Sequence, residues 1–308
     1  MSHNPKDLEP SSGGTSARER GRGRPRRSAG VMQPVPGASL APLGGLARYL
    51  AIYGAFWRYS LVREMGFKLN FILWILVELL WFGLQLSFMA VIYSHTDHIA
   101  SWSRWQVVFL VGANHFIQQL FTALFLSNCL KLSENIRSGG LDFLLLMPVN
   151  ARFLVSLRHV DFGAFFNAAS AVVVMVYAGM QLHLAPSVAQ YAGFALLLLV
   201  GLSVHYSVMY ALACTGFWTV RAEGILWGYY NLFQLARLPA DAFQGLFRAV
   251  FTFVVPVLLV SNVPVKLIID KLGSPLEMLW LVLISAVMFT LSEWFWRASI
   301  RHYASASS

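Results

Sequence analysis

Polar and ionisable side chains stand inside apolar stretches of this sequence, where such side chains are costly. Glu78 lies in LVELLWFGLQ, and Gln85 follows seven residues later, on the same face if the stretch is helical. His115 and Gln118 share a stripe of a second apolar stretch, and His205 lies in a later one. An ionised group at the centre of a membrane helix costs about 3 kcal/mol, so these side chains are expected to face protein or water. We expect them either to line a path for a polar or amphiphilic substrate or to hydrogen-bond one helix to another.

Motifs of enzymes and nucleotide-binding proteins are missing from the sequence. It has no GxxxxGK[ST] loop to cradle ATP phosphates and no GxSxG. HTDH, His95 to His98, offers two imidazoles and a carboxylate, but no further ligands gather near it, so a zinc site is not favoured. We therefore predict no catalytic, cofactor-binding or metal-ligating residues in this chain, and no enzyme activity of its own.

A second group of chemically distinctive residues lies in IRSGGLDFLLLMPVN, between two long apolar stretches. Gly139 and Gly140 can end a helix and turn the chain back. Charged residues on either side suit a polar partner, and isolated apolar ones suit a pocket, as in a compact hot spot. The candidate residues for docking a partner are Glu134, Ile136, Arg137, Gly139, Gly140, Leu141 and Asp142. The alternative is a hairpin that only lies on lipid.

The elements that must position these side chains follow from composition. Hydrophobic residues make up 57% of the 308 residues and charged residues 12%, where a soluble protein carries about a quarter charged residues. The apolar residues gather in runs near the roughly 20 residues that a membrane helix needs, without the alternation of a membrane barrel. We predict an all-α polytopic membrane protein with six transmembrane helices, over about 69–93, 105–128, 160–182, 188–213, 241–262 and 276–296.

One part of this arrangement is less regular. Pro256 would kink the span over 241–262. The preceding segment 223–237 is short for a crossing, so we expect it to lie in the membrane interface, with Gly224 and Gly228 allowing close helix contact.

Both ends of the chain differ from the apolar middle. Residues 1–42 are rich in Gly, Pro, Ser and Arg, which predicts a disordered basic tail, and 305–308 form a short carboxyl-terminal end. RERGRGRPRR resembles an AT-hook, but a basic tail beside a membrane more often meets anionic lipid, so nucleic acid is not the favoured partner. Residues 43–66 repeat apolar and aromatic side chains at helical spacing with arginines between them. They predict an amphipathic helix at the interface.

The basic residues outside the tail are unevenly distributed between the two sets of flanks. Thirteen lie on one side: Arg48, Arg58, Arg63, Lys68, Lys131, Arg137, Arg152, Arg158, Arg221, Arg237, Arg248, Arg297 and Arg301. Only three, Arg104, Lys266 and Lys271, lie on the other. The positive-inside rule then places both termini and the connections 129–159 and 214–240 in the cytoplasm.

Several stretches, taken in order, carry a resemblance over roughly residues 45–308. They are RYLAIYGAFWRYSLVREMGFKLNFILWILVELLW, SWSRWQVVFLVG, IRSGGLDFLLLMPVNARFLVSLR, FWTVR, RLPADAF, VVPVLLVSNVP and RHYASAS. Together they resemble the permease subunits of type-2 ABC (ATP-binding-cassette) transporters, in particular a bacterial subfamily with six spans. The resemblance places the permease domain at 43–304, in a bacterial inner membrane.

The resemblance also implies partners. Such permeases pair with themselves or with a related permease and are driven by cytoplasmic ATPase subunits, so ATP and Mg would be bound by a partner chain and no cofactor by this one. Most such systems export their substrate. Their connection between the second and third spans forms a coupling helix on the ATPase, which implies that role for residues 131–145 here.

Two other classes of protein remain open from the sequence. A secondary transporter without an ATPase would show two related halves with broken helices at matching places, and only Pro256 interrupts a span here. An integral-membrane transferase would need an acid–base or metal constellation near one face, and none emerges. The substrate, and whether the permease pairs with itself or with a relative, stay open.

Overall fold

The computed structural model describes residues 45–219 and 222–303, and within these ranges all regular secondary structure is helical. The expected tail 1–42 with its AT-hook-like stretch, Arg221 and the end 305–308 lie outside the described residues. The helices are α1 (Gly45–Gly66), α2 (Lys68–Tyr93), α3 (Arg104–Phe121), η1 (Thr122–Leu126), α4 (Ser127–Ser138), α5 (Gly140–Leu145), α6 (Ala151–Leu157), α7 (Phe162–Gln181), α8 (Val188–Cys214), η2 (Thr215–Phe217), α9 (Glu223–Leu232), η3 (Phe233–Arg237), η4 (Ala240–Ala242), α10 (Gly245–Ala249), η5 (Val250–Val254), α11 (Val257–Ile268) and α12 (Leu276–His302).

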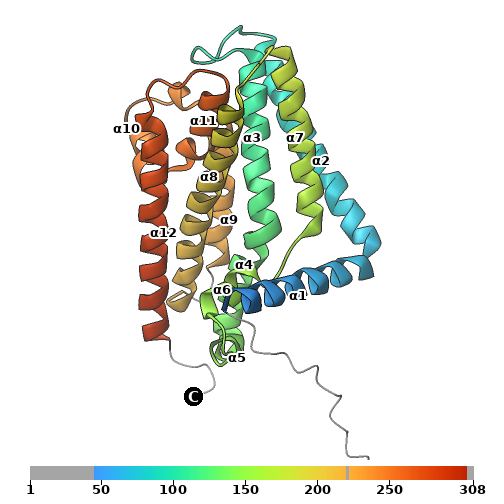
Figure 1. The fold of residues 1–308 in the computed structure, drawn as a ribbon, viewed down its shortest axis with the longest axis vertical. Helices are drawn as coiled ribbons and strands as arrows, with labels where there is room; N and C mark the ends of the chain where they lie inside the picture. The colour runs from blue at the N-terminus through green and yellow to red at the C-terminus, as the bar shows by residue number, and fades with distance from the viewer. Residues whose placement is uncertain (1–44, 220–221, 304–308) are drawn as a thin grey trace, which may run out of the picture. The chain divides into compact units, whose positions relative to one another are not determined.

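Within the described residues, five helical stretches are long and apolar enough to cross a membrane, or six if the bent pair 245–254 and 257–268 counts as one. They are Lys68–Tyr93, Arg104–Ser138, Phe162–Gln181, Val188–Phe217 and Leu276–His302. Figure 1 shows them side by side as an upright bundle, with α4, α5 and α6 together at its lower end. We call this the α4–α6 end, and we call the end with the loop 94–103 the opposite end. The prediction of an all-α polytopic membrane protein is confirmed.

Helix α1 lies across the bundle at the α4–α6 end (Figure 1). Its aromatic face packs on the chain around α6 and the start of α7, where Tyr49 meets Phe153 edge to face at 4.9 Å and Trp57 meets Phe162 at 5.3 Å. Ser60 accepts a hydrogen bond from the backbone of Val160 at 3.1 Å. The other face carries exposed apolar side chains, so one face of the helix lies on the protein and the other is turned outward.

The expected span over 241–262 is not one continuous helix. The segments 245–254 and 257–268 meet at Val255–Pro256 with a bend of 87°, where proline cannot donate a backbone hydrogen bond. Gly201 lies directly against Val260, and Gly193 against Leu267, so α11 runs antiparallel to α8 along only the first half of α8. The two segments therefore form a hairpin in the half of the bundle near the opposite end.

Before the bent pair, α9 and η3 lead the chain toward the opposite end. Their buried side chains are packed into the bundle: Tyr229 bonds to His205 of α8 and Gln234 bonds to Gln118 of α3. Four residues beyond η3, Asp241 accepts a hydrogen bond from Trp102 in the loop at the opposite end. The expectation that 223–237 lies in the membrane interface is corrected, because its buried side chains lie inside the bundle.

This correction changes the distribution of charge. Arg248, counted with the thirteen, forms an ion pair with Asp241 at 3.3 Å and so lies at the opposite end. Arg237 lies inside the bundle rather than on a flank. Arg237 and Arg248 therefore no longer count toward the α4–α6 end, and Arg248 is added to the opposite end. The basic residues of the sequence still favour the α4–α6 end.

Candidate functional site

Two cavities meet at Glu78 on the outer side of α3. The first, which we call the inner cavity, has a volume of about 530 Å³ and lies between α2, α3 and the α9–η3 segment. The second, the α1 cavity, has a volume of about 580 Å³ and extends from Glu78 toward α1 and the start of α7. Both are lined by Glu78, Gln119 and Tyr230, so these three side chains form the boundary between them.

Amide and hydroxyl groups join the helices around this boundary. The Gln119 side-chain amide donates to the Glu78 carboxylate at 3.1 Å, linking α3 to α2. The Gln234 amide donates to Gln118 at 2.8 Å, linking η3 to α3. The hydroxyls of Tyr230 and Thr122 lie 3.1 Å apart. Polar residues of five elements, α2, α3, η1, α9 and η3, thus hold one another in place while facing the cavities.

Four of the five side chains that the sequence analysis singled out in apolar runs come together here. Glu78, Gln85, His115 and Gln118 all line the inner cavity. The His115 ring is buried and stacks on Phe82 with ring centroids 3.9 Å apart, so it forms the base of the cavity rather than its open surface.

The fifth side chain, His205, lies elsewhere. It is fully buried between α8 and α9, stacked on Phe233 at 3.8 Å and bonded through Nδ1 to the Tyr229 hydroxyl at 3.0 Å. It lines neither the inner cavity nor the α1 cavity. The structure therefore gives His205 a packing environment and separates it from the other four.

Sequence reasoning missed the residues that α9 and η3 contribute to the site. Tyr230, Gln234 and Arg237 are spaced four and three residues apart, so they share one helical face, and all three line the inner cavity. That spacing was the signal available in the sequence. It was passed over because the segment had been placed in the interface.

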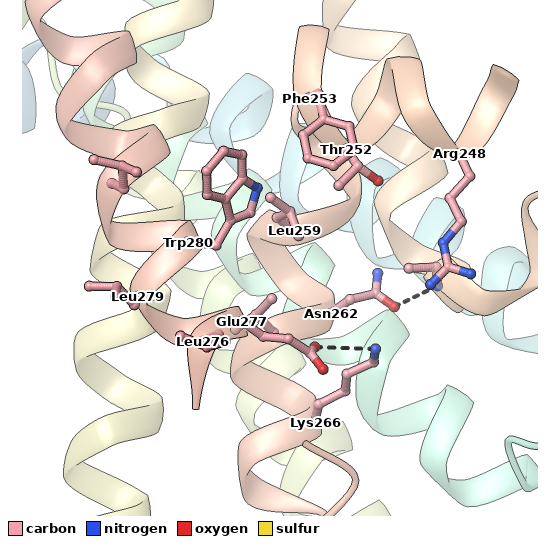
Figure 2. A pocket seen from close by; sticks show the side chains of 13 residues that line it. Arg248, Thr252, Phe253, Leu259, Asn262, Lys266, Leu276, Glu277, Leu279 and Trp280 are labelled. Carbon is pink, nitrogen blue, oxygen red and sulfur yellow. Dashed lines mark hydrogen bonds and ion pairs between the residues drawn. The ribbon is translucent and has the colours of Figure 1, made fainter. Parts of the chain in front are cut away.

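A third cavity, the hairpin pocket, lies between the bent hairpin and α12 and has a volume of about 610 Å³. Figure 2 shows its apolar wall of Trp280, Leu259 and Phe253 and, beside it, the charged groups. The cations here are already paired. Lys266 lies 3.4 Å from Glu277 and 3.8 Å from Asp241, and Arg248 bonds to Asp241 as well. These ion pairs hold the hairpin to α12 through Glu277 and to η4, which precedes the hairpin, through Asp241.

The junction of α1, α4 and α7 places cations around one imidazole. Nδ1 of His159 lies 3.2 Å from Arg63, and Nε2 lies 3.2 Å from Lys131. Burial of the ring, followed by the charges of Lys131, Arg63 and Arg158, lowers the pKa of His159 to about 4. Burial likewise raises the pKa of Glu64, which accepts hydrogen bonds from the Phe162 backbone. The ring of His159 is therefore neutral near pH 7.

The segment that the sequence analysis chose for docking turns sharply at the α4–α6 end. Helix α4 ends at Ser138, and Gly139 takes φ 73°, a left-handed conformation that glycine adopts without strain. This confirms that the glycine pair breaks the helix. Gly140 then opens α5.

The side chains of this segment divide into exposed and buried ones. Glu134 and Arg137 are exposed and Ile136 is partly buried against the core, while Asp142 is partly exposed. Leu141, expected to be an apolar anchor for a partner, is fully buried within its own chain together with Leu144. That expectation is corrected, because α5 turns positions 141 and 144 inward.

Other apolar side chains of α5 and of the turn after it point outward. Phe143 is 72% exposed and Leu146 81% exposed, beside the less exposed Met147. The described surface at this end therefore offers two large apolar side chains on the same short segment as Glu134 and Arg137.

Arg152, counted in the sequence only for its charge, ties α6 to the bundle. Its guanidinium donates to Tyr206 at 3.3 Å and to Ser292 at 2.8 Å, and it forms an ion pair with Glu293. It also lies over the Tyr210 ring at 4.7 Å. The turn carrying Phe143 and Leu146 is thereby joined through α6 to α8 and α12.

Comparison with known proteins adds one match. Residues 79–307 match the family described as ABC-2 family transporter protein. No curated protein matches the chain.

Proposed function

The chain belongs to the ABC-2 family of transporter proteins, and on that premise we propose that it is the permease of an ATP-driven exporter that docks on its ATPase through the α4–α6 end. ATP and Mg would be bound by the separate ATPase, and this chain would supply the path and the docking surface. The observation that carries the docking proposal is the outward turn of Phe143 and Leu146 beside a sharp glycine corner.

The chemistry of this surface suits a protein partner. Interfaces draw most of their binding energy from a few large side chains that enter pockets, surrounded by a polar rim. Phe143 and Leu146 are of the first kind, and the exposed Glu134 and Arg137 on the preceding helix are of the second. Because Arg152 fixes α6 to α8 and α12, a force applied to this turn reaches the bundle.

The orientation follows from charge. Most basic residues outside the tail lie near the α4–α6 end, and the positive-inside rule favours the cytoplasm for that end. The ATPase would meet the turn there, and both termini would be cytoplasmic. The resemblance to bacterial permeases supports an inner-membrane location and export as the direction.

The path would follow the two cavities that meet at Glu78. One side of α9 beside these cavities is open. A Cβ added at Gly224 or Gly228 would meet no other part of the chain within 4 Å, and Trp227 is 45% exposed. A second permease, identical or related, placed against this face would close both cavities from the side. Glycines at i and i+4 allow such a close approach of helices within a membrane.

Cross-linking tests the docking surface. The native cysteines, Cys129 and Cys214, are buried, so a single cysteine introduced at Phe143 would be the reactive one. We expect Phe143→Cys to cross-link to the ATPase in membranes, and the matched variant His98→Cys, exposed at the opposite end, not to do so. Cross-linking from His98 alone would overturn the docking proposal. Reconstituted with the ATPase, the complex should move substrate away from the face that binds ATP.

A further inference from the structure

Arg237 is a cation inside the bundle without an anionic partner. It ends η3, is partly buried, lines the inner cavity, and makes no ion pair or hydrogen bond with any of residues 45–219 and 222–303. The carboxylate that lines the same cavity, Glu78, bonds to Gln119 instead. Elsewhere the corresponding cations are compensated, as Arg152 is by Glu293 and Arg248 by Asp241.

Such a charge is costly unless something neutralises it. An arginine inside a membrane protein is costly unless it pairs with an anion or faces water. The amides of Gln85, Gln118 and Gln234 around the same cavity can solvate a guanidinium or an anion, but they carry no charge. The inner cavity therefore presents one cation that forms no ion pair within the described residues, among hydrogen-bonding groups.

The facing wall of the inner cavity is apolar. Trp81, Leu84 and Phe88 stand three and four residues apart on one face of α2, and their side chains are 60%, 53% and 57% exposed. The cavity volume of about 530 Å³ is within the range of small-molecule sites, roughly 300–1,000 Å³. One wall thus suits an apolar chain, and the other presents donors and a cation.

We infer that the inner cavity binds an amphiphile bearing one anionic group, with that group on the Arg237 guanidinium and its apolar chain along Trp81, Leu84 and Phe88. The planar fork of arginine binds a sulfate, phosphate or carboxylate through two hydrogen bonds, which a point charge cannot do. The inference rests on the proposed function only in making this amphiphile the cargo. The binding site itself follows from the cavity.

Binding to the full-length chain alone, in nanodiscs of zwitterionic lipid, tests the site. The probes are an alkyl sulfate brominated along its chain and the brominated alcohol with the same chain. Bromine atoms quench the fluorescence of a tryptophan that they contact, so a probe bound in the inner cavity quenches Trp81. We expect the sulfate to quench at concentrations about tenfold lower in the wild type than in Arg237→Gln, and the alcohol to quench both equally. Arg237→Lys should lie between the two, because it keeps the charge but loses the fork.

The controls separate this site from other sources of binding. Arg248→Gln removes a cation that is already paired in the hairpin pocket, so it should leave the affinity for the alkyl sulfate unchanged. Sodium sulfate should not compete, and competition by it at equal concentration would overturn the amphiphile in favour of a simple anion site. Equal quenching of wild type and Arg237→Gln by the alkyl sulfate would also overturn the inference. So would loss of dimers in Arg237→Gln without loss of probe binding, because the partner of Arg237 would then be a carboxylate of a second copy.

This experiment uses no ATPase, so its outcome is independent of docking. Probe binding without cross-linking from Phe143 would leave the site standing and remove the proposed coupling. Cross-linking without probe binding at Arg237 would do the reverse.

Discussion

The side-chain amide of Gln119 donates to the carboxylate of Glu78 across 3.1 Å at the boundary of the two cavities. This contact joins α3, which is largely buried, to α2, which is largely exposed. It gives the carboxylate a donor inside the bundle while leaving it accessible from both cavities.

Replacing Glu78 should separate transport from folding. We expect Glu78→Leu to insert and fold, since leucine is favourable in a membrane helix, but to lower transport by about tenfold or more. Glu78→Gln keeps a partner for Gln119 and removes only the charge, so it isolates the charge effect. Transport by reconstituted permease and ATPase, with the yield of monodisperse protein as control, measures both. Unchanged transport in Glu78→Leu would make the carboxylate dispensable.

Loss of Arg152 should lower the free energy of unfolding more than loss of Arg297, a surface arginine that pairs with the same Glu293 carboxylate. Arg152→Ala removes an ion pair, two hydrogen bonds and the ring contacts, and we expect it to lower the free energy of unfolding by about 2–4 kcal/mol. Arg297 pairs with the same Glu293 but its side chain is 71% exposed, so Arg297→Ala should cost at most about 1 kcal/mol. Unfolding midpoints in detergent compare the two. Equal effects would contradict the assignment of Arg152 as a tie.

The neutral His159 should make stability depend on pH. Its pKa in the folded chain is about 4, below the ordinary value of 6.5, so the unfolded chain binds the proton more readily. The contribution of this group is therefore fully present above pH 6.5 and is lost as the pH falls toward 4. His159→Gln should flatten the unfolding midpoint between pH 6.5 and 4 relative to the wild type. An identical pH profile in the variant would show that other groups dominate this range.

Gly201 should tolerate no side chain. A Cβ there would lie 2.7 Å from the carbonyl oxygen of Val260, so Gly201→Ala must displace α11 and should cost about 1–3 kcal/mol. At Gly193 the added carbon meets only the end of the Leu267 side chain, and the cost should be smaller. Gly228→Ala meets nothing within 4 Å and serves as the neutral control in the isolated chain. Thermal unfolding ranks the three, and a neutral Gly201→Ala would contradict the close packing.

Reporter fusions test the arrangement of the crossings. A reporter active only in the cytoplasm should work after Ser308 or within 134–142 and fail near His98 or Leu184. A fusion at Gln244, between η4 and α10, should also fail, because Asp241 reaches the loop at the opposite end. Activity at Gln244 would restore the span expected from the sequence over 241–262.

Hydropathy predicted the all-α membrane fold because long apolar runs leave a helix as the main way to satisfy their backbone. It did not place α9 and η3 inside the bundle. That segment is short, and its second part is a 3-10 helix, which rises about 2.0 Å per residue instead of 1.5 Å, so it extends further than its length suggests. Its surroundings are protein on several sides, so Gln234 and Arg237 can stand in it without a long apolar run.

Helical periodicity in the sequence predicts which residues share a face of one helix, but not which helices pack together. It placed Glu78 with Gln85 and His115 with Gln118, but which faces of different helices meet depends on packing, and this put His205 elsewhere. In the docking segment, the spacing of Leu141 and Leu144 was the signal for a buried face. Phe143 and Leu146 lie on the opposite, exposed face of the same segment.

Of the 26 residues of α2, only Phe82 and Met89 are buried. Just before this helix, at Phe67, the helical backbone is interrupted between α1 and α2. Moving this helix outward uncovers little apolar surface that is not exposed already, and in a bilayer lipid tails take the place of lost helix contacts. The route into the two cavities that disturbs the bundle least therefore runs sideways past α2. A molecule dissolved in the bilayer could enter by that route without first passing through water at either end.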